Sequence, residues 1–149
     1  MKAIQDLYPD DFSHCFGCGN HNHAGHQLKS YVDGSEVIAR FTPASHHTSV
    51  PGFVYGGLIA SLVDCHAMAT AAASEITDDV APRFVTAALH VEYLKPTPLG
   101  PELVIRGRVT ERSPRKAVVE LTVQAGETIT VRANAVAVRL PRSMDSTKG

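Results

Sequence analysis

Asp64 is the side chain of this sequence best placed to act as a base, because it stands alone in a long apolar segment. Residues 58–75 contain no Gly or Pro and are rich in Ala and Leu, which predicts one helix of about five turns and about 28 Å. Aspartate is unfavourable in a helix interior, and no lysine or arginine three or four positions away can pair with it. An exposed surface aspartate is the alternative. We favour a carboxylate that activates water as a general base or attacks as a nucleophile.

Gly56 and Gly57 open this helix and offer backbone amides. The first amides of a helix lack intrahelical partners and carry partial positive charge, and glycines let a substrate oxygen approach closely. The pair is a candidate oxyanion site, although Gly-Gly also occurs in flexible loops. Gly56 lies eight residues before Asp64, which corresponds to about 12 Å along one helix. Because both groups cannot reach one carbonyl from the same helix, we expect a dimer with shared active sites.

The pattern of the helix indicates which side packs on other elements. At 100° per residue, the larger apolar residues and one histidine fall on the side that we expect to lie on a sheet. These are Leu58, Ile59, Leu62, Val63, His66, Ala69 and Ala73. The side around Asp64 carries mostly small residues, which leave space for another backbone or a ligand. These are Gly57, Ala60, Ser61, Ala67, Met68 and Ala71.

Extended segments flank the helix. Residues 28–41 alternate around a turn at Asp33-Gly34, which predicts a hairpin. Four further strands are predicted, at residues 84–94, 102–110, 117–123 and 128–138. One long helix and an antiparallel meander indicate an α+β fold. We expect a single domain over residues 1–149, with its core at about 12–140 and a peripheral Gly/His-rich N-terminal segment and C-terminal tail.

Composition narrows the functional classes. The 149 residues are 44% hydrophobic and 19% charged, with a formal net charge of -1, so no strong positive field attracts nucleic acid. The first residues do not combine a basic start with an apolar run, and no apolar stretch approaches the ~20 residues that span a bilayer. We expect a cytoplasmic protein with no nucleic-acid or membrane partner, whose three cysteines are reduced.

Cysteines and histidines gather between residues 14 and 26, where a zinc site is one interpretation. The cluster comprises His14, Cys15, Cys18, His21, His23 and His26. Cys-x-x-Cys supplies zinc ligands, but no second Cys-x-x-Cys follows, and one Gly-rich turn explains the same spacing. We expect a turn that holds no metal. His66 lies about 200° around the helix from Asp64, so we expect a core histidine rather than a catalytic partner.

Two stretches resemble the PaaI-like branch of the hotdog-fold acyl-CoA thioesterases. PGFVYGGLIASLVDCHA resembles its loop-and-helix motif, and TAALHVEYLKPTPLG resembles its strand motif ending in Tyr-Leu-x-Pro-x-Pro-x-Gly. CFGCG near the start is also common in relatives. The resemblance implies a long central helix wrapped by an antiparallel sheet and a homodimer or homotetramer with active sites at the subunit boundary. It implies no metal or cofactor.

The resemblance also assigns roles to residues. It gives Asp64 the place of the catalytic acid and the amide of Gly56, beside Gly57, that of the oxyanion donor. Ser49 stands where relatives often carry Asn or Gln beside the carboxylate. Thr86 stands where some relatives place a hydroxyl that orients water.

Tyr55 and Ser49 depart from the commonest pattern of the family. Tyr55 replaces a frequent histidine, yet a neutral phenol still donates a hydrogen bond at pH 7, so we expect the site to be altered rather than lost. Ser49 has a shorter reach than asparagine. His47, next to His46, either lines the entrance for the acyl group or is a polar loop residue.

Arg115 and Lys116 form a basic turn with Arg112. This turn could hold CoA phosphates, or it could be a solvated hairpin tip.

Taken together, the sequence predicts hydrolysis of a small or medium acyl-CoA thioester, with Asp64 activating water and the helix-start amides polarising the carbonyl. A non-catalytic acyl-CoA-binding or sensing protein on the same fold is the alternative. A hotdog-type enoyl-CoA hydratase would need Asp64 and His66 on one face, which the helix projection excludes.

Overall fold

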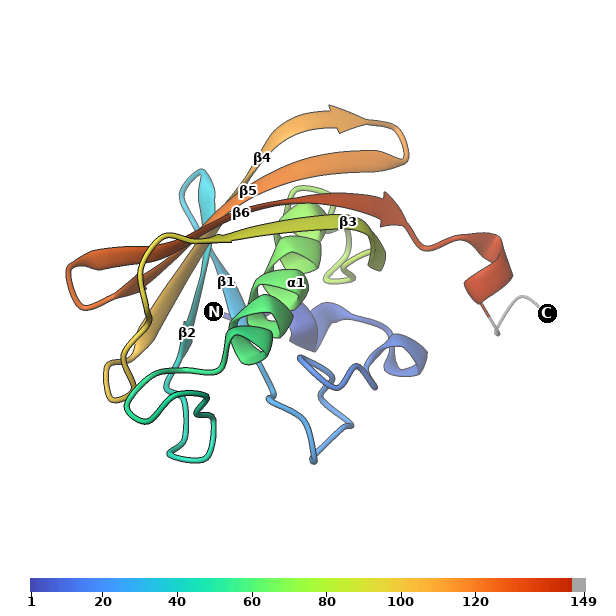
Figure 1. The fold of residues 1–149 in the computed structure, drawn as a ribbon. Helices are drawn as coiled ribbons and strands as arrows, with labels where there is room; N and C mark the ends of the chain where they lie inside the picture. The colour runs from blue at the N-terminus through green and yellow to red at the C-terminus, as the bar shows by residue number, and fades with distance from the viewer. Residues whose placement is uncertain (146–149) are drawn as a thin grey trace.

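The computed structural model describes residues 1–145, which form one long helix, six strands and three short 3-10 helices (Figure 1). The helix α1 spans Gly56–Ala73. The strands are β1 (Ser30–Asp33), β2 (Glu36–Phe41), β3 (Phe84–Tyr93), β4 (Leu103–Ser113), β5 (Lys116–Ala125) and β6 (Thr128–Arg139). The 3-10 helices are η1 (Ile4–Leu7), η2 (Asp10–Phe12) and η3 (Arg142–Met144). The last four residues of the expected C-terminal tail lie outside the described range.

The six strands make one antiparallel sheet in the order β1-β2-β4-β5-β6-β3, and this sheet curves around α1 (Figure 1). The expected α+β arrangement, a long helix wrapped by an antiparallel sheet, is confirmed. The order leaves β1 and β3 as the two edges. The first hairpin turns one residue later than expected, because Asp33 pairs with Glu36 and leaves Gly34 and Ser35 as the turn.

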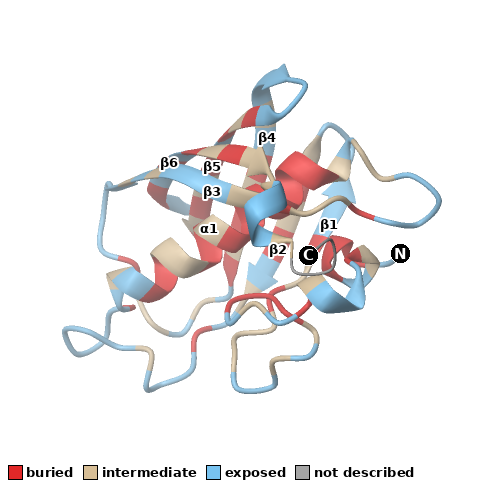
Figure 2. Cartoon of the chain, turned by 90° about the vertical axis from the view of Figure 1, so that its right-hand side faces the viewer, coloured by how far each residue is buried: buried red, intermediate tan, exposed pale blue. Residues whose placement is uncertain are grey.

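Helix α1 is buried along most of its length (Figure 2). The predicted sheet side is buried from Leu58 to Ala69, and Ala73 is partly exposed. The side around Asp64 is open only in its N-terminal half. Ala67, Met68 and Ala71 are buried within the chain, so of the two expected uses of this side, another backbone or a ligand, these three positions leave no open space for a ligand.

The first residues of the chain belong to the core. Ile4 and Tyr8 are buried in the same hydrophobic cluster as the sheet-facing residues of α1, and Leu28 joins them. Apolar side chains in this segment cover surface of α1 that the sheet leaves open, because η1 contacts both α1 and β1. The expected core boundary near Phe12 therefore excluded residues that are part of the core.

By length and composition, α1 is the one helix among the described residues that could cross a membrane. However, 67% of its apolar window is buried inside the fold. A core helix covered by a sheet on one side gives the same composition, which explains the hydrophobic run without a bilayer.

Candidate active site

Asp64 and Thr86 form the central polar contact of the candidate site. Thr86 Oγ1 donates a hydrogen bond of 2.5 Å to Asp64 Oδ1. Asp64 lies on the third turn of α1, and Thr86 lies near the start of the edge strand β3, so helix and strand together fix the carboxylate. None of the ion pairs among residues 1–145 involves Asp64. The carboxylate is therefore half-buried, oriented by one hydroxyl and not neutralised by a cation.

The helix start offers open amides. Helix α1 begins at Gly56, and its N-cap residue Tyr55 makes no side-chain capping hydrogen bond. The Leu58 amide already donates to the Tyr55 carbonyl at 3.1 Å, so the amides of Gly56 and Gly57 are the ones that keep their capacity to donate. The Tyr93 hydroxyl donates to the Gly56 carbonyl at 2.7 Å and fixes this end of the helix against β3. Burial and the neighbouring Tyr55 raise the pKa of Tyr93, which keeps its hydroxyl protonated.

Tyr55 lies directly over Gly57. A methyl group built on Gly57 would lie 2.6 Å from two ring carbons of Tyr55, a separation that two carbon atoms cannot adopt. The Tyr55 side chain is 56% exposed. The ring can therefore rest against the helix start only because residue 57 has no side chain.

A mostly apolar cavity of about 520 Å³ adjoins Gly56. Its volume falls in the range of sites for small organic ligands. Its lining includes Ser49, Val50, Phe53, Val54, Gly56, Ile59, Tyr93, Leu94, Lys95, Pro96 and Thr97. Apolar residues before α1 and at the end of β3 thus form a pocket next to the helix-start amides.

Strand β3 connects the two halves of the site, since Thr86 contacts Asp64 and Tyr93 contacts Gly56. Gly56 is eight positions before Asp64, so the two still lie about 12 Å apart along α1. Within one chain, the Asp64 carboxylate and the amide of Gly56 therefore lie at two different places along the helix, and they are too far apart to act on the same carbonyl group.

His66 takes no part in this site. Its ring is fully buried, with Nε2 donating to the Val37 carbonyl at 2.9 Å and Nδ1 accepting from the Ser30 hydroxyl at 2.9 Å. Burial lowers the pKa of His66 to about 4, although the hydrogen bond to Val37 opposes this shift. The expected core histidine is confirmed, and the Asp64–His66 pair that a hydratase needs is absent from the described residues.

The remaining predicted substrate-binding residues lie in two places. Ser49 lines the apolar cavity. His47 does not line this cavity: its Nδ1 accepts the Ala44 amide hydrogen at 2.9 Å, and its ring contacts His46 and Phe41. Desolvation, followed by the charges of neighbouring histidines, lowers the pKa of His47. A neutral loop residue fits this geometry better than a residue of the acyl entrance.

Arg115 and Lys116 are exposed at the tip of the β4–β5 hairpin. Lys116 pairs with Val138, which in turn pairs with Val85 next to Thr86, so this tip lies at the Asp64 end of the sheet. Arg112 is not available for a phosphate, because it forms a 2.5 Å ion pair with Glu75, two residues beyond the end of α1.

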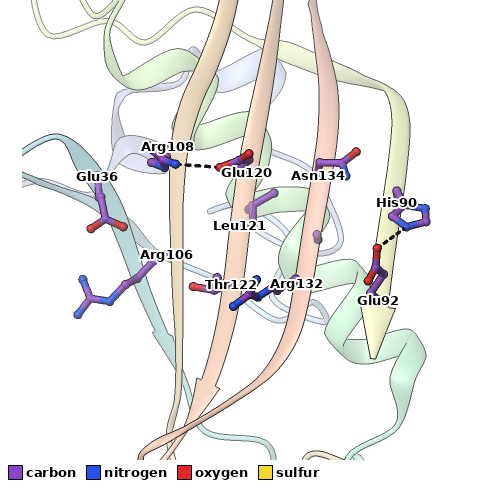
Figure 3. Close-up of a pocket in the computed structure, with 11 residues that line it drawn as sticks. Glu36, His90, Glu92, Arg106, Arg108, Glu120, Leu121, Thr122, Arg132 and Asn134 are labelled. Atoms are coloured by element: carbon purple, nitrogen blue, oxygen red, sulfur yellow. Dashed lines mark hydrogen bonds and ion pairs between the residues drawn. The ribbon is translucent and has the colours of Figure 1, made fainter. Parts of the chain in front are cut away.

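A second concave surface lies on the strands (Figure 3) and is lined largely by charged side chains. Arg108 pairs with Glu120 at 3.0 Å, and His90 pairs with Glu92 at 3.1 Å. These groups largely satisfy one another, and neither Asp64 nor the helix start lines the surface. It is therefore not part of the candidate active site.

Two residues that matter were not predicted. Tyr93 lies inside the quoted strand motif, but nothing in its spacing shows that its hydroxyl reaches Gly56. Cys65, next to Asp64, lies with Cys15 and Cys18 in a group whose sulfur atoms are all within 4.8 Å of one another. Cys15 and Cys65 are fifty residues apart in the sequence, so only the tertiary fold brings their sulfur atoms together.

Comparison with curated proteins links this chain to acyl-CoA thioesterases. The acyl-coenzyme A thioesterase THEM4 of Rattus norvegicus is 30% identical over 102 residues, which cover 68% of this chain and 41% of the relative. The chain thus spans about two fifths of the length of this relative.

Solved structures share the fold. A thioesterase superfamily protein from Shewanella loihica PV-4 is 47% identical, with a TM-score of 0.70, and the match covers 89% of this chain and 98% of the other. The E. coli PaaI protein matches with a TM-score of 0.66 at 14% identity, over 78% and 81% of the two chains. The smu.793 protein of Streptococcus mutans UA159, solved bound to acetyl CoA, matches with a TM-score of 0.64 at 22% identity, over 81% and 97%.

A family model supports the same grouping. The model described as thioesterase superfamily matches residues 51–138, which contain both motifs that suggested the resemblance. The predicted PaaI-like hotdog fold is therefore confirmed by model and structures together. With more than half of its length matched, this chain belongs to the thioesterase superfamily.

Proposed function

We propose that this chain hydrolyses small or medium acyl-CoA thioesters to the free acid and CoA, at sites shared between two copies. One observation carries the proposal: Asp64, oriented by Thr86 and free of cations, lies on the same helix flank as the open amide of Gly56. The family membership and the similarity to a rat acyl-coenzyme A thioesterase support the reaction. The acetyl-CoA bound to a protein of the same fold supports the substrate class.

In the proposed reaction, the thioester carbonyl oxygen accepts hydrogen bonds from the amides at Gly56 and Gly57. Asp64 removes a proton from water, and the water oxygen attacks the carbonyl carbon. The negative charge that develops on the carbonyl oxygen is stabilised by the amides and by the partial positive charge of the helix start. The carbon–sulfur bond then breaks, and the CoA sulfur leaves with its electron pair and is protonated. Direct attack by Asp64, through an anhydride, is the alternative course.

The separation along α1 requires a second copy in this proposal. Two antiparallel helices related by a two-fold axis bring Gly56 of one copy opposite Asp64 of the other. The edge strand β3 supports such an arrangement, because its outer edge is unpaired and most of its residues are exposed, including Thr86 and His90. We propose a homodimer, or a homotetramer built from it, with two equivalent sites per dimer.

The cavity next to Gly56 suits the acyl group. Its walls include Val50, Phe53 and Leu94, and its volume of about 520 Å³ matches a small or medium chain. Arg115 and Lys116 lie exposed at the Asp64 end of the sheet. We assign them to the CoA phosphates.

The test is a panel of acyl-CoA substrates of increasing chain length, assayed for free thiol with the wild type and with Asp64→Asn. The substitution keeps the shape of the side chain and removes its basicity, so turnover should fall on the order of 10²-fold or more. Affinity for acyl-CoA should change far less, because the amides and the cavity remain. Asp11→Asn, at an exposed position in η2, is the matched control.

Near-normal turnover of Asp64→Asn would remove Asp64 from the catalytic role. Tight acyl-CoA binding by the wild type without turnover of any substrate would favour the binding or sensing protein instead.

A further inference from the structure

We propose that Cys15, Cys18 and Cys65 form a zinc site that fastens the N-terminal segment to helix α1. This site is separate from the proposed hydrolysis and does not depend on it. The sequence led us to expect a turn without a metal at Cys15 and Cys18, because Cys65 was not recognised as a third possible ligand. The proposed zinc site differs from that expectation.

The spacing of the sulfur atoms fits zinc. The Cys15 and Cys65 sulfurs are 3.7 Å apart, and all three sulfurs lie within 4.8 Å of one another. Thiolates bound to one tetrahedral zinc at about 2.3 Å are separated by about 3.8 Å. A disulfide needs a sulfur–sulfur distance of about 2.05 Å. The Cys15–Cys65 distance of 3.7 Å therefore matches two ligands of one ion and is too long for a covalent bond.

The backbone around Cys15 is shaped as a ligand loop. The Gly19 amide donates to the Cys15 carbonyl at 2.7 Å, and the Leu28 amide donates to the Gly17 carbonyl at 3.1 Å. These backbone bonds hold the turn that carries Cys15 and Cys18. Gly17 also lies on Cys65: a methyl group at residue 17 would be 2.3 Å from the Cys65 sulfur. The loop that carries Cys15 and Cys18 therefore packs directly against the Cys65 side chain of α1.

Polar groups near the cysteines complete the site. Arg83 is partly buried, and its guanidinium lies 4.9 Å from the centre of the ring of Tyr8, which belongs to the same buried cluster as Cys18 and Cys65. Three thiolates and one Zn²⁺ carry a net charge of -1, which the Arg83 cation neutralises. The Tyr8 hydroxyl is buried and has no hydrogen-bond partner among the described residues.

Cys15 is half-buried, whereas Cys18 and Cys65 are buried, so zinc enters from the Cys15 side and water takes the fourth position. Binding releases the thiol protons to solvent. Cys65 is adjacent to Asp64 in sequence but projects about 100° away around the helix. The ion therefore holds the loop in place and does not approach the reacting carbonyl.

The experiment measures zinc in untagged protein purified under a phosphine reductant, followed by chelation and titration with Zn²⁺ or Co²⁺. About one zinc per chain is expected, with thiolate-to-cobalt charge-transfer absorption after Co²⁺ addition. Removal of zinc should lower the thermal unfolding midpoint, and zinc addition should restore it. Cys65→Ser and Cys15→Ser should both lose the metal and the absorption band.

His23→Ala is the matched control, because His23 is exposed in the same segment; it should retain both signals. If Cys65→Ser fails to fold, Cys15→Ser decides the matter, since Cys15 is the less buried ligand. The proposal is overturned if reduced wild type binds neither ion stoichiometrically, if both cysteine variants retain zinc, or if mass spectrometry finds a disulfide between two of these cysteines in place of the metal.

Discussion

The hydroxyl of Thr86 donates to Asp64 Oδ1 across 2.5 Å, from an edge strand to the interior of the only long helix in the described chain. One carboxylate oxygen is thus held in place. The other keeps its lone pairs for a water molecule. In the proposed reaction Thr86 is therefore a positioning residue.

Thr86→Val should keep the shape of the side chain and remove this hydrogen bond. We expect kcat to fall about 10-fold, which corresponds to the loss of one hydrogen bond to a charged group. KM should change little, because Thr86 holds the base and does not contact the acyl cavity. Steady-state kinetics separate the two parameters, with Thr128→Val at an exposed position as the control. A rise in KM at unchanged kcat would contradict a role in positioning the base.

Shared sites can be tested by complementation between two inactive variants. Asp64→Asn lacks the base, and Gly56→Val blocks the helix-start amide. In a randomly mixed dimer, half of the assemblies are heterodimers with one intact site each, so co-expression should restore about a quarter of wild-type activity. The mixture is measured against each variant alone. No recovery, from mixtures shown to contain heterodimers, would mean that Gly56 and Asp64 act within one chain or do not act together.

Gly57→Ala should displace the Tyr55 ring, because the new methyl group would lie 2.6 Å from it. If the methyl also blocks access to the helix-start amides, turnover should fall on the order of 10²-fold, as for the loss of an oxyanion donor. The double variant Tyr55→Ala, Gly57→Ala separates the two effects. Recovery in the double variant would trace the loss to the displaced ring, and its persistence would trace it to the blocked amides. Full activity of Gly57→Ala would exclude both.

His66 should make the fold sensitive to acid. Its pKa is lowered to about 4 in the folded protein, whereas an unfolded histidine titrates near 6.5. The unfolded state therefore binds the proton first as pH falls, so stability is fully present above about 6.5 and declines toward pH 4 by up to about 3 kcal/mol. Urea unfolding across this range measures the effect. His66→Gln, which cannot titrate, should show a shallower decline, and an identical pH dependence would contradict the assignment.

Local patterns were sufficient to predict the main elements. The absence of Gly and Pro in residues 58–75 predicted a helix that the structure places at Gly56–Ala73. Each of the four predicted later strands overlaps an observed one, since β-branched residues between turn-forming segments mark strands regardless of tertiary context. The spacing of Gly56 and Asp64 along one helix could also be predicted, because it depends only on helix geometry.

Contacts between distant segments could not be predicted in this way. Helix periodicity shows that the side chains of Cys65 and Asp64 point in different directions from the helix. It does not show that Cys15 lies against Cys65. Thr86 was assigned through the family resemblance, and only the strand order places it beside α1.

The buried hydrogen bonds around Ser30 have a practical consequence for shortening this protein. Gln5 Oε1 accepts the Ser30 amide at 2.8 Å, and Gln5 Nε2 donates to the Ser30 hydroxyl, which in turn contacts His66. An expression variant trimmed to residue 12 would remove Gln5 and leave the Ser30 amide in the interior without its acceptor, next to an uncovered apolar surface. Such a truncation deletes part of the core, and purification tags are better placed ahead of Met1 than in exchange for the first eleven residues.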